Sequence, residues 1–150
     1  MIAAAKSNVI LMADDDSDDR LLAQDALAES GLATDVRFVE DGVELMDYLH
    51  RRAKFSQSGS CPRPGLILLD LNMPKKDGRE ALREIKADSE LRKIPVVVLT
   101  TSTADTDIAR IYELGANSFI SKPVAFNALV DLMKVVGKYW FEVVVLPVRT

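Results

Sequence analysis

Five short apolar runs recur along the chain and alternate with stretches of helical periodicity. Several are continuous runs of Val, Ile and Leu, which are typical of parallel strands that are covered on both faces. The predicted strands are Asn8–Ala13, Thr34–Val39, Gly65–Asp70, Pro95–Thr100 and Asn117–Ser121.

Between the predicted strands, apolar residues repeat at helical spacing. The clearest repeats, at i, i+3, i+4 and i+7, are Ile108, Ile111, Tyr112 and Gly115, and then Leu129, Leu132, Met133 and Val136. Ser17 is predicted to cap the first helix, with Asp18 and Asp19 in its opening turn, where negative charge suits the helix dipole. Five successive strand–helix pairs predict an α/β fold, in which right-handed crossovers build a parallel sheet.

Size and composition fit one compact domain with a core of its own. The chain has 150 residues, of which 48% are hydrophobic and 28% charged. Its net charge of −4 and the lack of a basic cluster argue against nucleic-acid binding. No apolar run reaches the roughly 18 residues of a membrane span. Because the single cysteine, Cys61, cannot form an internal disulfide, a reducing compartment fits best, and we expect a cytoplasmic protein.

Polar side chains follow four of the predicted strands at their carboxyl ends. Three acids, residues 14–16, come after the first strand, and Asp70 and Asn72 come at the end of the third. Thr100 ends the fourth strand, and Lys122 follows the fifth. In an open parallel sheet, functional sites form beyond the carboxyl ends of the strands. We therefore expect these side chains to meet at one rim.

This combination of side chains favours phosphoryl transfer to a carboxylate. Carboxylates that lie close together repel one another unless a cation joins them, and oxygen ligands of this kind suit Mg²⁺. Lys122 would supply a positive charge, and Thr100 a hydroxyl donor, for phosphoryl oxygens. Each residue alone also has an ordinary interpretation as a helix cap, a turn former or a solvated side chain. Their shared position at one rim of the predicted sheet favours a functional site over these separate ordinary roles.

Four motifs, in this order and spacing, resemble those of the receiver domains of two-component response regulators. They are ILMADDDSDD, LILLDLNMPKKDG, VVVLTTS and GANSFISKP. The resemblance implies a flavodoxin-like (βα)5 receiver fold, with five parallel strands and helices on both faces of the sheet. We place this domain at residues 7–138 and expect an extended C-terminal tail at residues 139–150.

The resemblance also assigns roles to the residues at the predicted rim. It makes Asp70 the phosphoacceptor. The protein ligands of Mg²⁺ would be Asp14, Asp15, Asp70 and the backbone carbonyl of Asn72. No organic cofactor is implied.

A conformational switch is implied in the same way. Thr100 and Lys122 would contact the phosphoryl group, and Phe119 would be the aromatic residue that turns inward on activation. Pro123 belongs to this switch region, and the resemblance implies a cis Lys122–Pro123 bond, a geometry that is tolerable essentially only before proline.

Three longer segments resemble the stand-alone regulators that partner cyanobacterial and bacterial phytochrome histidine kinases. They are LILLDLNMPKKDGREALREIK, IPVVVLTTSTADTDI and YWFEVVVLP. This implies a single-domain response regulator that receives its phosphoryl group from a sensor histidine kinase, here a phytochrome. Because no effector domain follows in the sequence, output is expected through protein contacts or a phosphorelay. Such a protein would catalyse only its own phosphotransfer and dephosphorylation.

The tail YWFEVVVLPVRT is apolar and rich in β-branched residues. An exposed apolar segment of this kind is avoided in soluble monomers. We therefore expect the tail to join two copies into a homodimer; the alternative is that it folds back on its own domain.

Three alternative functions conflict with the residues of these motifs. A phosphatase of the haloacid dehalogenase type needs a second acid two residues after its nucleophile, where Asn72 cannot act as a general acid. A calcium loop at DDDSDD lacks the required glycine, and Asp25 stands where the closing glutamate is needed. An inactive receiver fold, acting only by binding, conflicts with the intact set Asp14, Asp15, Asp70, Thr100 and Lys122.

Overall fold

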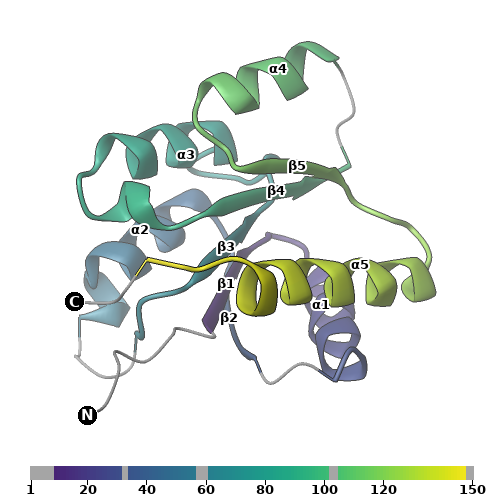
Figure 1. The fold of residues 1–150 in the computed structure, drawn as a ribbon. Coiled ribbons are helices and arrows are strands. Elements are labelled where there is room, and N and C mark those ends of the chain that lie inside the picture. The colour runs from purple at the N-terminus through teal and green to yellow at the C-terminus, as the bar shows by residue number, and fades with distance from the viewer. Residues whose placement is uncertain (1–8, 32–33, 57–60, 102–104, 148–150) are drawn as a thin grey trace.

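The computed structural model describes residues 9–31, 34–56, 61–101 and 105–147, and it alternates strands and helices in the predicted order (Figure 1). The strands are β1 (Val9–Ala13), β2 (Asp35–Val39), β3 (Leu66–Leu69), β4 (Val96–Thr100) and β5 (Ser118–Ser121). The main helices are α1 (Ser17–Glu29), α2 (Gly42–His50), α3 (Gly78–Ala87), α4 (Asp105–Glu113) and α5 (Phe126–Lys138). Within the described ranges, none of the helices has the length and apolarity needed to cross a bilayer. The start of the predicted domain, residues 7 and 8, lies outside them.

All five strands pair in parallel, in the order β2-β1-β3-β4-β5. This is the flavodoxin-like order, so the predicted fold class is confirmed. The register fixes which strand ends are neighbours: Ala13, the last residue of β1, pairs with Leu69, the last residue of β3. Asp14 and Asp70 therefore follow two adjacent strands at the same level of the sheet.

The sheet is covered on both faces, and this explains its continuous apolar runs. Alternate side chains of the strands enter two separate hydrophobic clusters. One cluster lies under α1 and α5, and the other lies under α2, α3 and α4 (Figure 1). Neighbouring residues of β3 show the alternation, since Leu68 belongs to the first cluster and Leu69 to the second. Both faces need apolar side chains, so the central strands β1 and β3 carry only apolar residues, whereas the edge strands β2 and β5 also carry polar ones.

The predicted cap of α1 is wrong by one residue. Asp16, not Ser17, is the N-cap, and its carboxylate accepts hydrogen bonds from the backbone N–H groups of Asp18 at 2.9 Å and Asp19 at 3.3 Å. A carboxylate at this position accepts two of the unpaired N–H groups of the first turn and places a full negative charge at the positive end of the helix dipole. Ser17 is therefore already the first helical residue.

The tail is also corrected in its first part, because it does not begin as an extended segment. Residues Tyr139–Val143 form a π-helical turn that continues α5. Trp140 and Phe141 pack against the cluster under α1 and α5, and Leu146 is buried. Burial of these side chains on the domain outweighs the β propensity of the segment, which depends strongly on context. The boundary predicted at residue 138 stays a prediction.

Candidate functional site

Three carboxylates meet at the rim formed by β1 and β3. Oxygen atoms of Asp14, Asp15 and Asp70 all lie within 4.8 Å of one another. Asp14 is fully buried, Asp70 is half-buried and Asp15 is exposed to solvent. The expectation that the carboxyl ends of the strands bring these acids together is confirmed.

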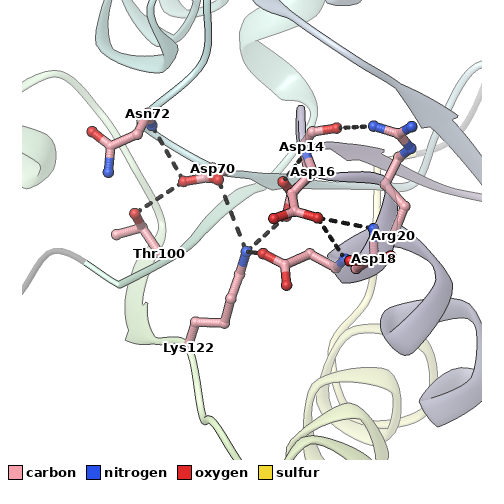
Figure 2. Close-up of polar contacts among 9 residues, drawn as sticks. Asp14, Asp16, Asp18, Arg20, Asp70, Asn72, Thr100 and Lys122 are labelled. Atoms are coloured by element: carbon pink, nitrogen blue, oxygen red, sulfur yellow. Dashed lines mark hydrogen bonds and ion pairs between the residues drawn. The ribbon is translucent and has the colours of Figure 1, made fainter.

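Asp14 is fixed in place by both its backbone and its side chain. Its N–H donates to the carbonyl of Val39 at 3.1 Å, and its own carbonyl accepts from Arg20 Nη1 at 2.7 Å. Its Oδ1 accepts the backbone N–H of Asp16 at 3.0 Å, and its Oδ2 accepts from Lys122 Nζ at 2.7 Å (Figure 2). Both carboxylate oxygens of this buried acid are thus occupied, as a buried charge requires.

Asp70 stands directly after β3 and is held by its backbone N–H, which donates to the carbonyl of Ala13 at 3.0 Å. Its Oδ1 accepts from the Thr100 hydroxyl at 3.0 Å and from the Asn72 N–H at 3.2 Å (Figure 2). Its Oδ2 lies 3.9 Å from Lys122 Nζ. Burial raises the pKa of Asp70 above its ordinary 3.8, and the charge of Lys122 only partly opposes this effect. The ionised carboxylate is therefore less stabilised in this site than in water.

The loop that carries Asp70 packs tightly against the start of α3. A Cβ atom on Gly78 would lie 2.4 Å from the carbonyl oxygen of Asp70 and 2.7 Å from Cα of Leu71. The N–H of Gly78 also donates to the carbonyl of Leu71 at 3.0 Å. Only glycine allows this approach, which explains the glycine eight residues after Asp70.

Lys122 brings a positive charge to the three carboxylates. Its Nζ contacts Asp14 Oδ2 at 2.7 Å and Asp19 Oδ2 at 3.0 Å, and only 10% of its side chain is exposed. Burial lowers the pKa of Lys122, but the hydrogen bonds and charges of Asp14 and Asp19 outweigh it, so the pKa stands above its ordinary value. The sequence placed Asp19 only in the opening turn of α1. Its position three residues after the N-cap, at the end of the helix that faces the rim, was the available signal.

The residues of the predicted switch lie on β4, β5 and the loop that follows. Thr100 is fully buried and donates its hydroxyl hydrogen to Asp70. Phe119 is partly buried against the cluster under α2, α3 and α4, and its N–H donates to the hydroxyl of Tyr112 on α4 at 3.1 Å. The expectation of a cis Lys122–Pro123 bond is wrong for this structure, because the described residues include no cis peptide bond. Trans is the ordinary preference even before proline.

The donor set fits a hard divalent cation. Three carboxylates share this space with one ammonium group, which leaves an excess of negative charge. Magnesium is commonly held through one or two carboxylates together with waters and phosphate oxygens. Asn72 lies at the same rim, with its N–H directed to Asp70. The assignment of its carbonyl as a ligand stays a prediction.

Comparison with known proteins gives consistent matches over nearly the whole chain. The sequence profile of the response regulator receiver domain matches residues 10–134. The response regulator Rcp1 of Synechocystis sp. is 41% identical over 139 residues, which are 93% of this chain and 92% of Rcp1.

Two solved structures support the same relationship. The phosphorylated cyanobacterial phytochrome response regulator RcpA is 42% identical, with a TM-score of 0.86 over 94% of this chain and 99% of RcpA. The Mn²⁺-bound form of Rcp1 is 40% identical, with a TM-score of 0.83 over 93% of this chain and 98% of that one. The chain belongs to the family of response regulator receiver domains and is therefore a signalling protein of the two-component type.

Proposed function

We propose that the protein accepts a phosphoryl group from a sensor histidine kinase onto Asp70, with Mg²⁺ held by Asp14, Asp15, Asp70 and the carbonyl of Asn72. One observation carries this proposal. A half-buried carboxylate contacts a hydroxyl donor and lies 3.9 Å from an ammonium group, beside two further acids. The Mn²⁺-bound structure of the relative Rcp1 supports the choice of a divalent metal.

The groups at the rim suit each step of the transfer. A carboxylate oxygen of Asp70 attacks the phosphorus atom, the bond to the kinase histidine breaks, and the leaving imidazole keeps the electron pair and takes up a proton. Bound Mg²⁺ would screen the charge between the attacking carboxylate and the phosphoryl oxygens. The Thr100 hydroxyl and the Lys122 ammonium can turn to those oxygens as donors. Attack of water on the acyl phosphate would then return Asp70 and release inorganic phosphate.

The proposed donor is a phytochrome histidine kinase, because the relative RcpA is a phytochrome response regulator. We expect a phosphorylated phytochrome kinase to lose its label to this protein within minutes when Mg²⁺ is present, and not in EDTA. Gel autoradiography of mixtures with phytochrome and unrelated kinases measures this transfer. Equal transfer from unrelated kinases would contradict the choice of donor, and no transfer from any kinase would contradict the function itself.

We further propose a switch through Thr100, Phe119 and Pro123. Once Thr100 donates to the phosphoryl group, it leaves space beside β4 into which the Phe119 ring can turn. Beryllium fluoride, which mimics the phosphoryl group, is expected to shift the NMR signals of the Phe119 ring and of the Tyr112 hydroxyl region. Unchanged signals for β5 and α4 under saturating beryllium fluoride would contradict the switch.

We also propose that the C-terminal segment forms a homodimer. Val143 is 61% and Val145 is 87% exposed, although Leu146 is buried and Trp140 and Phe141 are partly covered by the domain. A dimer would present two phosphorylation sites to a dimeric kinase and would bury the remaining apolar side chains.

Charges at these two valines are expected to separate the dimer. The double variant Val143→Lys and Val145→Lys leaves the covered side chains in place and should elute as a monomer at micromolar concentration, whereas the wild type should elute as a dimer. Light scattering after size exclusion measures the mass. Val43→Lys on α2, also a partly exposed valine, is the matched control and should remain a dimer. A monomeric wild type would contradict the proposal.

We infer a cytoplasmic location for the protein. A sensor kinase presents its phosphorylated histidine in the cytoplasm, and the single cysteine, which is buried in the domain, suits a reducing compartment. Fractionation of cells that express the protein tests this, since recovery outside the cytoplasmic fraction would contradict it.

A further inference from the structure

Lys122 bridges two carboxylates of different kinds. Asp14 belongs to the three acids that fit a divalent cation, whereas Asp19, which comes from the opening turn of α1, does not. Nζ lies 2.7 Å from Asp14 Oδ2 and 3.0 Å from Asp19 Oδ2. Asp70, the remaining acid near this ammonium, is farther away at 3.9 Å.

A divalent cation and the Lys122 ammonium compete for Asp14. Oδ1 of Asp14 already accepts the N–H of Asp16, and Oδ2 already accepts from Lys122. A cation held by the three carboxylates would therefore bind an acid that already has an ammonium group 2.7 Å from its Oδ2. Two positive charges around one carboxylate repel each other strongly in a partly buried site. Cation binding is accordingly linked to the ease with which Lys122 moves away from Asp14.

We propose that Asp19 is a positioning residue that holds the Lys122 ammonium when a divalent cation takes over Asp14. Asp19 is already in contact with Nζ, and 35% of its side chain is exposed, so it can follow the ammonium as it moves. Without this second carboxylate, Lys122 would have to leave Asp14 for water or for Asp70 alone. A partly buried ammonium group resists the loss of its nearby carboxylate partner. The inference rests on the proposed binding of Mg²⁺ at this rim.

Asp19→Asn tests this role, and Asp18→Asn is the matched control. Both substitutions remove one negative charge from the first turn of α1, but no contact joins Asp18 to Lys122 among the described interactions. We expect Asp19→Asn to bind Mg²⁺ at least about fivefold more weakly than Asp18→Asn, a factor that one partly buried ion pair can supply. Isothermal titration calorimetry measures both affinities.

A double-mutant cycle separates the ion pair from a general structural effect. In a Lys122→Met background there is no ammonium to hold, so the two substitutions should weaken Mg²⁺ binding equally. NMR of the Lys122 ammonium adds a direct signature: at saturating Mg²⁺ its signal should persist in Asp18→Asn and disappear through exchange with water in Asp19→Asn.

Each outcome bears on the proposal. Equal affinities of the two single variants, a difference that survives Lys122→Met, or an ammonium signal that persists in Asp19→Asn would overturn it while leaving the proposed function intact. A wild-type protein that binds no Mg²⁺ would overturn both.

Discussion

Asp70→Asn is expected to abolish phosphorylation completely. With Mg²⁺ and a small phosphodonor such as acetyl phosphate, the wild type should gain one phosphoryl group, because Asp70 is the carboxylate that contacts Thr100 and faces Lys122. An amide at this position keeps an oxygen acceptor but is not a competent nucleophile. Intact-protein mass spectrometry and Phos-tag gels measure the product. Asp131→Asn, an exposed acid on α5, is the control and should be labelled like the wild type.

A loss of label in Asp70→Asn should not come from unfolding. Because burial raises the pKa of Asp70, its ionised form opposes folding at neutral pH, and this cost vanishes as the pH falls below the ordinary pKa of 3.8. In EDTA the variant is therefore expected to melt a few degrees above the wild type at pH 7, where about 1 kcal/mol moves the melting temperature by about 2–4 °C. Labelling of the folded variant at the wild-type level would show that the phosphorylation site lies elsewhere.

Asp15→Ala is expected to weaken Mg²⁺ binding by more than about 100-fold. Even outer groups of metal sites contribute about 10–100-fold to affinity, so the loss of a ligand should exceed this. Asp15 is exposed and its oxygen lies within 4.8 Å of those of Asp14 and Asp70, so its removal should alter the site without disturbing the core. Thermal melts with and without Mg²⁺ measure the effect as a lost increase in melting temperature.

The control for Asp15→Ala is Asp18→Ala, a second exposed acid close in sequence that is not one of the three carboxylates. It should retain nearly all of the stabilisation by Mg²⁺. If Asp15→Ala is stabilised by Mg²⁺ as strongly as this control, then Asp15 is not a ligand.

The fold could be predicted from the sequence because the three central strands, β1, β3 and β4, are buried on both faces. A strand such as β3, in which every side chain is buried, appears in the sequence as a continuous apolar run. Because helices alternate with such runs along the chain, a parallel sheet is predicted. The meeting of Asp14, Asp70, Thr100 and Lys122 follows from the same topology, since the carboxyl ends of neighbouring strands share one rim.

The remaining features depend on tertiary contacts and local backbone geometry, which the hydrophobic periodicity of the sequence does not encode. The contact between Asp19 and Lys122 joins residues 103 positions apart, and it depends on the packing of α1 against α5, the helix that follows Lys122 in the chain. The choice of Asp16 over Ser17 as the cap depends on backbone angles at a single residue. The helical start of the tail depends on a surface for Trp140 and Phe141 that exists only after the domain has folded.

The close packing at Gly78 means that the surroundings of Asp70 can adjust more easily on one side than on the other. On the α3 side, the backbone of Asp70 has little room to shift, because it lies so close to Gly78 that even one added Cβ atom would be 2.4 Å from its carbonyl oxygen. On the opposite side, Thr100 and Lys122 reach Asp70 through side chains that rotate about single bonds. Adjustment to a bulky new group on Asp70 is therefore expected to travel toward β4, β5 and α4, while α3 stays still. A protein that distinguishes the forms with and without this group on Asp70 would have to bind at the edge formed by α4 and β5. The signal of a probe attached to α3 should hardly change between the two forms.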